Sequence, residues 1–279
     1  MTVTSSSTTS SKASLRGWER ALLVLPALAG LALGILLVFM PDRFATLFQF
    51  APDDVYIYQL AGAAIMGYGV ALTLSVFERA WLAVRLVVIG VLVNNLGSLY
   101  ACGAELITGH APASVYLFLV TNLLFAAICV LLLRRHAGVP HPAPTVTSLA
   151  VKGFLVVGAV AAGVFGILPL FAPQLFTLFN LHINAPFVIR EAGAGSLGYA
   201  VVAVLAQRAL NRVELPLIIV MAAVFNGVGG LVSLPYLLTG DVALLPWVIA
   251  PVGLIVCVVC LIGLRQVMGS KQQESATAP

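Results

Sequence analysis

The chain has 279 residues, of which 61% are hydrophobic and only 9% are charged, and its mean hydropathy is +1.08. Soluble globular domains carry about 25% charged residues, so this composition excludes a soluble protein. The net charge of +4 comes from Lys and Arg that are scattered singly rather than clustered, which excludes a nucleic-acid interface. Apolar runs of roughly 20 residues, enough to cross a bilayer, recur along the chain. We therefore predict an all-α integral membrane protein whose main partner is the lipid bilayer.

The apolar runs predict eight transmembrane helices. The first run, near 21–40, ends at Met40-Pro41-Asp42 and not at a small-residue cleavage site, which favours a retained helix over a signal peptide. It follows a Ser/Thr-rich stretch, residues 1–15, that we predict to be a disordered tail. The other spans are expected near 55–77, 81–100, 113–133, 149–171, 186–207, 215–236 and 242–264.

The two sets of four spans share a register in which related residues are 131 positions apart; we call such residues paired positions. Thr46-Leu47-Phe48 returns as Thr177-Leu178-Phe179, and Gly67-Tyr68 returns as Gly198-Tyr199. Chance similarity between apolar stretches would not keep glycines and polar residues in one frame, so we predict an internal duplication. The predicted units are a first four-helix repeat (16–135, the first half), a Pro-rich cytoplasmic linker (136–147), a second four-helix repeat (148–266, the second half) and a polar C-terminal tail (267–279).

The basic residues predict the orientation of the chain in the membrane. Of the fourteen Lys and Arg residues, all but Arg43 and Arg190 fall on one side of the predicted helices. Cytoplasmic loops carry the excess of Lys and Arg, so both termini are predicted to be cytoplasmic in a multi-pass protein of the cell membrane. Because four spans return the chain to its starting side, the two repeats are predicted to be parallel.

A stripe of small residues marks the second and the sixth predicted helices. In lipid, small residues allow helix backbones to approach closely, so we interpret the stripe as a helix-packing surface, with a cavity lining as the alternative. Its members are Gly62, Ala63 and Gly67 in the first half and Gly193, Ala194 and Gly198 in the second half.

An adjacent charge pair distinguishes the second half from the first. Arg190 and Glu191 stand where the first half has Gln59 and Leu60. Charged residues within spans are costly and often functional, so we place a candidate ligand or polar site here. In this hypothesis Arg190 anchors an anionic group and Glu191 is buried against a neighbouring helix. The alternative is an arginine that reaches the headgroups along its apolar stem.

Two amides at paired positions, Asn95 and Asn226, complete the candidate polar site. An amide in hydrocarbon needs a hydrogen-bond partner, so each is expected either to bond a neighbouring helix or to line a pore.

No sequence motif indicates catalysis, a cofactor or a metal. The chain contains no Walker A, GxSxG or HExxH pattern. Its four histidines fall in predicted loops, which disfavours haem ligation across a helix bundle. Three of its four cysteines lie inside apolar runs, and no disulfide framework is predicted. We therefore predict no catalytic, cofactor-binding or metal site.

Each half resembles the DoxX-like and related four-helix (tetraspan) bacterial membrane protein families. The resemblance rests on a Pro-x-x-Phe turn, at Pro41 and more loosely at Pro173, followed by Ala-Gly-Ala and Gly-Tyr. It implies a fused pair of tetraspan modules in a bacterial inner membrane and brings no defined chemistry with it.

The composition and the missing motifs favour a non-enzymatic accessory or scaffold subunit of a membrane complex, which would contact other membrane subunits or a second copy of itself. The alternative is a transporter or binding protein for a small apolar or anionic molecule, and a membrane enzyme comes third.

Overall fold

The computed structural model describes residues 14–50, 55–109, 111–140, 149–184, 186–208, 213–239 and 244–277. Eight of the helices in these ranges are long and apolar enough to cross a membrane, which confirms the predicted all-α polytopic fold. The elements are α2 (Gly17–Phe39), α3 (Pro41–Phe48), α4 (Val55–Phe77), α5 (Trp81–Ile107), α6 (Ala113–Arg135), α7 (Leu149–Phe171), η1 (Pro173–Phe179), α8 (Pro186–Arg208), α9 (Leu215–Thr239) and α10 (Leu244–Thr277).

The structure adds two short elements and extends two spans. Helix α3 and the 3-10 helix η1 follow α2 and α7, and each ends in a left-handed residue at paired positions, Gln49 (φ 58°) and Asn180 (φ 60°). Helix α5 runs to Ile107, and α10 continues to Thr277 through the predicted polar tail, whose Lys, Gln and Glu residues favour a helix. Most of the predicted N-terminal tail and most of the Pro-rich linker lie outside the described residues.

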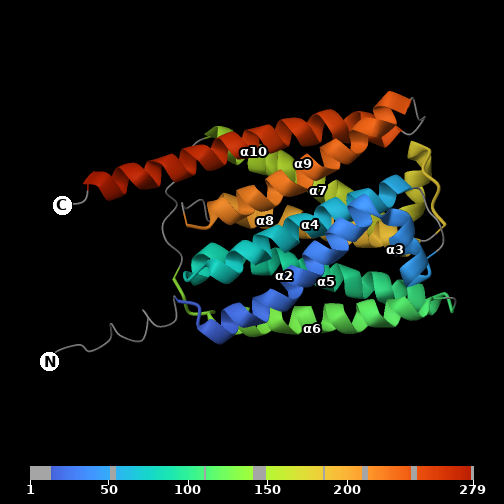
Figure 1. Ribbon diagram of the computed structural model, residues 1–279, viewed down its shortest axis with the longest axis horizontal. Helices are drawn as coiled ribbons and strands as arrows, with labels where there is room; N and C mark the ends of the chain where they lie inside the picture. The colour runs from blue at the N-terminus through green and yellow to red at the C-terminus, as the bar shows by residue number, and fades with distance from the viewer. Residues whose placement is uncertain are drawn as a thin grey trace.

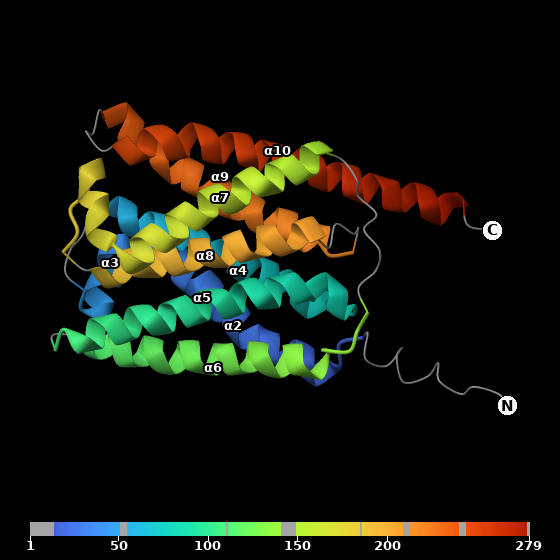
Figure 2. The same ribbon diagram turned by 180° about the vertical axis from the view of Figure 1, so that it is seen from behind.

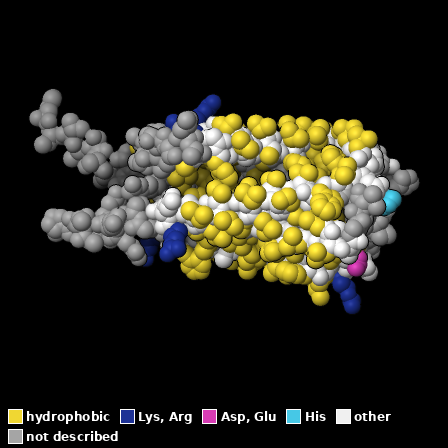
Figure 3. Space-filling model, turned by 90° about the horizontal axis from the view of Figure 1, so that it is seen from above, with side chains coloured by type: hydrophobic (Ala, Val, Ile, Leu, Met, Phe, Trp, Pro, Cys, Tyr) yellow, Lys and Arg dark blue, Asp and Glu magenta, His cyan; other side chains and the backbone are white. Residues whose placement is uncertain are grey.

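Four inner helices, α4, α5, α8 and α9, are flanked by four outer ones, α2, α6, α7 and α10 (Figure 1). Helix α2 begins and α10 ends at the same end of the bundle, which we call the terminal side; the opposite end is the far side. Figure 3 shows one face of the molecule, on which hydrophobic side chains cover the middle and Lys and Arg side chains lie toward the two ends. This distribution suits a protein surrounded by hydrocarbon.

The two halves interlock in space. Helix α4 packs mainly on α2 and on α9, while α5 packs mainly on α8 and on α6. By comparison, α4 and α5, which follow each other in the chain, contact each other little, as do α8 and α9. Across the centre of the bundle, the inner helices therefore pack on inner helices of the other half more than on each other within one half.

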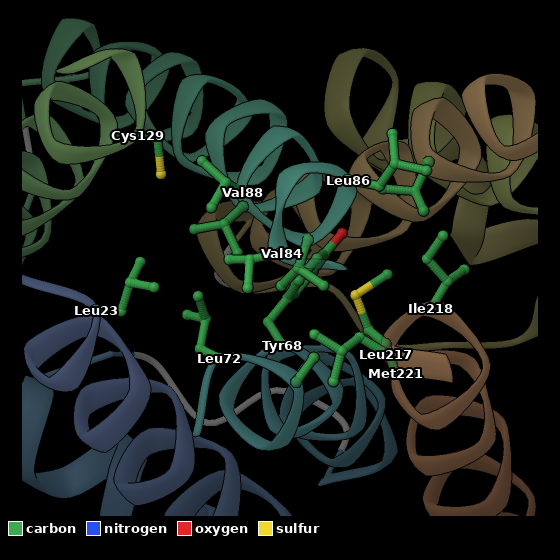
Figure 4. Packing of buried hydrophobic residues seen from close by; sticks show 14 of the residues in the cluster. Leu23, Tyr68, Leu72, Val84, Leu86, Val88, Cys129, Leu217, Ile218 and Met221 are labelled. Carbon is green, nitrogen blue, oxygen red and sulfur yellow. The ribbon is translucent and has the colours of Figure 1, made fainter. Parts of the chain in front are cut away.

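The centre of the bundle is a pair of tyrosines that bond each other's helices. The Tyr68 hydroxyl donates to the Gly195 carbonyl (2.8 Å), and the Tyr199 hydroxyl donates to the Ala64 carbonyl (3.0 Å). The two bonds join α4 and α8 at paired positions, and the ring centroids lie 4.6 Å apart. Around Tyr68, the core combines side chains of both halves, such as Val84 with Met221 (Figure 4).

Candidate functional site

An apolar cavity of about 280 Å³ lies among α7, α8, α9 and α10, with α4 behind it; we call it the second-half cavity. Three of its described lining residues carry polar side chains, namely Ser196, Tyr199 and Asn226. The hydroxyl of Tyr199 and the amide nitrogen of Asn226 already donate hydrogen bonds to backbone carbonyls. The cavity is thus suited to an apolar molecule and offers no cluster of groups for catalysis.

The paired space in the first half is almost filled. A cavity of about 30 Å³, the first-half cavity, remains there. Five of its nine lining residues are paired with residues that line the second-half cavity. These five are Ala61, Ile65, Phe118, Val188 and Glu191. The two cavities are therefore the same place in the two halves, closed in one and open in the other.

Glycines of α2 hold this outer helix against α4. A Cβ added at Gly34 would lie 2.9 Å from the backbone of Met66, and one added at Gly30 would lie 3.1 Å from the backbone of Gly69. These two close contacts keep the backbones of α2 and α4 together.

Helix α7 packs on α8 through Gly163 and Gly166, and a Cβ added at Gly166 would lie 2.8 Å from the Leu197 backbone. Leu197 is paired with Met66, so this contact is equivalent to that of Gly34 in the first half. The contact at Gly163 is looser, because an added Cβ there would lie 4.0 Å from the side chain of Ala200. Figure 2 shows α7 crossing over α8 at an angle, with α10 beside it.

A polar cluster also joins the outer helices of the first half on the terminal side. The buried Glu19 of α2 accepts a bond from Arg135 of α6 (2.5 Å) and lies 3.2 Å from His136. The His136 ring stacks on Trp81 with centroids 4.5 Å apart. The pairs of Glu19, Arg135 and His136 are Ala150, Gln266 and Val267, which carry no charge. The sequence of the second half therefore has no equivalent cluster to tie α7 to α10.

Burial of the outer helices shows the same difference. In the most apolar stretch of α2 and of α6, 33% of the residues are buried, compared with 22% in α7 and 17% in α10. Helices α7 and α10 consequently expose more of their length to the surroundings.

The charge pair predicted as a site is divided between two contacts of α8 with α5. Arg190 lies 3.5 Å from Glu105, and Glu191 accepts a hydrogen bond from Ser98 (2.6 Å). Arg190 and Glu191 thus point to different partners, and Glu191 is placed against a neighbouring helix. Carboxyl oxygen Oε1 of Glu191 is buried and has no hydrogen-bond partner among the described residues.

Neutral groups make the paired contact, which joins α4 to α9. Tyr236 is paired with Glu105, and its hydroxyl donates to Gln59 (3.1 Å), which is paired with Arg190. Gln59 also donates to the Val38 carbonyl of α2 (3.2 Å). The polar groups at these positions therefore join inner helices, as an ion pair in one place and as a hydrogen bond in the other.

The expected bonds from Asn95 and Asn226 to neighbouring helices are replaced by local ones. Each amide nitrogen donates to the carbonyl four residues earlier in its own helix, at 2.7 Å for Asn95 and 2.8 Å for Asn226. The reason is that this carbonyl is always within reach of an amide in a helix. Asn95 is buried, whereas Asn226 lines the second-half cavity.

The small-residue stripe lies at two kinds of close contact, one with an outer helix and one between inner helices. In the first half, Gly62 faces α2 and Gly67 faces the Tyr199 hydroxyl. In the second half, Gly193 faces α7 and Gly198 faces the Tyr68 hydroxyl. Ala63 and Ala194 are fully buried. The tyrosine pair fits between the inner helices because glycine leaves room for each hydroxyl.

Sequence reasoning missed the second-half cavity. The sequence carries no clear signal for it, because the closest glycine contact of the outer helix is present in both halves, at Gly34 and at Gly166. Among the described residues, no group of three or more His, Cys, Asp or Glu side chains could hold a metal ion.

Comparison with known proteins identifies no relative: no family model, no curated protein and no solved structure matches the chain.

Proposed function

We propose that this protein is a membrane-embedded binding protein for an apolar molecule, which it takes from the bilayer into the second-half cavity. The observation that supports the proposal is the open space of about 280 Å³ where the paired space of the first half retains about 30 Å³. An engineered apolar cavity of about 150 Å³ is already large enough to bind benzene. The second-half cavity has room for a larger apolar ligand.

The energy of an empty cavity supports an occupant. Apolar walls that face an empty space forfeit dispersion contacts, so an apolar occupant stabilises them. A helical scaffold gains nothing from such a loss of contacts, and the first half shows that the same arrangement can be packed closely. The cavity thus favours the binding function over a purely structural accessory subunit.

The walls of the cavity indicate entry from the side. Val157 of α7 is 69% exposed, and Val248 and Val252 of α10 are each 52% exposed, although all three line the cavity. The opening therefore lies between α7 and α10, on an apolar surface. A molecule dissolved in the hydrocarbon can enter there without crossing water.

The proposal includes the duplication and the orientation of the chain. Reciprocal bonds of Tyr68 and Tyr199, and left-handed residues at Gln49 and Asn180, support two repeats of one ancestral tetraspan unit, as the resemblance to DoxX-like families implies. The excess of Lys and Arg supports a cytoplasmic terminal side. A reporter inserted after Val139 should therefore be active in the cytoplasm; an external signal would contradict this orientation.

The binding function can be tested by native mass spectrometry of protein that is extracted gently from its own membranes. We expect a small apolar molecule to remain bound in a one-to-one complex. Gly158→Leu should abolish retention, because Gly158 lines the cavity and a Cβ there meets nothing within 4 Å, so the leucine fills the space without a clash.

Gly153→Leu is the matched control. Gly153 lies on the same helix, is exposed and has equally open surroundings, but it does not line the cavity. Loss of the molecule in both variants, or retention in both, would contradict the proposed site. A stoichiometric protein partner in place of the small molecule would favour the accessory-subunit function instead.

A further inference from the structure

We infer that the occupant of the second-half cavity is a single long hydrocarbon chain, of an acyl or isoprenoid lipid, that lies parallel to the helices. This inference rests on the proposed function and adds the shape of the ligand to it.

The length of the cavity indicates a chain. Its lining extends from Phe154 to Pro169 along α7 and from Ile189 to Ala203 along α8. At 1.5 Å per residue, both walls are roughly 20 Å long. The hydrocarbon layer of a bilayer is about 30 Å thick, so the cavity extends over more than one leaflet. A compact molecule would leave most of this length empty.

The width of the cavity indicates one chain. A volume of about 280 Å³ distributed along this length makes the cavity narrow relative to its length, which suits one extended hydrocarbon chain. The narrow shape also maximises dispersion contacts between a chain and the walls, which is the main source of affinity when ligand and solvent are both apolar.

The polar groups of the cavity wall need no hydrogen bond from the ligand. Tyr199 and Asn226 donate to the backbone carbonyls of Ala64 and Ala222. A hydrocarbon chain can pass them without leaving either donor unsatisfied. The polar end of an amphiphilic ligand would then lie beyond one end of the cavity, at the level of the headgroups.

Two glycines lie at different depths along the cavity and allow its length to be changed. Gly158 lies on α7 nearer to the terminal side. Gly229 is the last cavity-lining residue of α9, nearer to the far side. A Cβ at Gly229 would make ordinary contacts, at 3.9 Å with Ile249 and 4.0 Å with Leu60. A leucine at either position should shorten the space from one end.

The test is competition by a series of straight-chain fatty acids, from octanoic to stearic acid, against a photoreactive fatty acid in nanodiscs that contain the full-length protein. Each acid is compared at the same mole fraction in the lipid, so that partition from water does not contribute. We expect displacement to improve on the order of tenfold from octanoic acid to palmitic acid and then to level off. In Gly229→Leu the improvement should stop at a shorter chain, and in Gly153→Leu it should not change.

The outcomes separate this inference from the proposed function. If a compact competitor such as adamantane carboxylic acid displaces the probe as well as palmitic acid does, the cavity binds apolar molecules but the inference of a chain is wrong. If none of the lining residues is photolabelled, the proposed function itself is contradicted. Crosslinking of a second copy's helix into the cavity would contradict both. Better competition by geranylgeraniol than by palmitic acid would support the chain and assign it to the isoprenoid class.

Discussion

Each half contributes two inner and two outer helices to the bundle. The outer helices of the first half leave a cavity of about 30 Å³, whereas those of the second half leave one of about 280 Å³. In the first half, Gly30 and Gly34 bring α2 against α4, and the Glu19 cluster ties α2 to α6. In the second half, α7 keeps the close contact through Gly166, but the residues paired with the Glu19 cluster carry no charge. The difference teaches that an outer helix can form a ligand-sized space while the inner helices keep their packing.

The inner helices show a second difference that leaves the geometry unchanged. At paired positions, the contact between α4 and α9 is a neutral hydrogen bond of Gln59, whereas the contact between α5 and α8 is an ion pair of Arg190. The positions of these contacts have been kept while their chemistry has changed. The following predictions test how much the individual contacts of the two halves contribute to the stability of the protein.

The largest effect is expected from replacing the glycine that makes the closest contact between α2 and α4. Gly34→Phe should destabilise the protein by about 3 kcal/mol or more, because the new side chain would overlap the Met66 backbone. Thermal unfolding in detergent should show a large fall in Tm. Gly17→Phe, at an open position of the same helix, should have little effect. An unchanged Tm in Gly34→Phe would show that glycine packing does not close the first half.

Removal of the polar cluster should have the next largest effect. Glu19→Gln leaves Arg135 without its anionic partner, but Arg135 is 36% exposed and can reach water, so we expect a loss of about 2 kcal/mol. Hydrogen exchange should increase at the terminal-side ends of α2 and α6. The half-exposed Glu78 provides the comparison, since Glu78→Gln should leave exchange in these helices unchanged. Faster exchange confined to α7 and α10 would contradict the assigned role of the cluster.

The two tyrosines of the central pair should contribute equally to the free energy of unfolding. Tyr68→Phe and Tyr199→Phe each remove one hydroxyl bond to a backbone carbonyl, which is worth about 1 kcal/mol. Chemical denaturation should therefore give two similar losses of unfolding free energy. A loss more than twice as large in one variant would show that the centre of the bundle is less symmetric than its contacts.

The smallest effect is expected where the polar contact between α5 and α8 is replaced by apolar residues like those at the paired positions of α4 and α9. The pair Ser98 and Glu191 corresponds to Gly229 and Leu60. Glu191→Leu combined with Ser98→Ala should change stability by less than about 1 kcal/mol, because an apolar pair of suitable size can replace a buried polar pair. The Tm of the double variant measures this. A large destabilisation would assign Glu191 a structural role that its partner in the first half does not have.

The sequence was sufficient to predict the membrane-spanning helices but not to predict which helices pack against one another. Apolar runs predict each span because only a continuous helix satisfies its backbone in lipid. They do not indicate which helix packs on which, since lipid-facing and protein-facing surfaces are both apolar. The interlocking of α4 with α9, and of α5 with α8, therefore required the structure.

The candidate polar site could likewise be predicted only in part from the sequence. The charges of Arg190 and Glu191 were visible in the sequence, but their partners, Glu105 and Ser98, lie 85 and 93 residues away along the chain. The second-half cavity depends on how α7 and α10 are placed beside α8 and α9, which the apolar sequences of these helices do not indicate. Helix packing is thus the step at which prediction from composition and spacing fails.

The interlocked inner helices have a consequence for how the protein is made. When the ribosome has completed α6, helices α4 and α5 are already in the membrane, but α9 and α8, their main partners from the other half, have not been synthesised. The first four helices must therefore wait in the bilayer with unpaired inner faces until the last four arrive. Residues 1–140 produced alone should be degraded, and co-expression with residues 141–279 should rescue them. Assembly of this protein is then a late, whole-chain event, even though its sequence reads as two successive units.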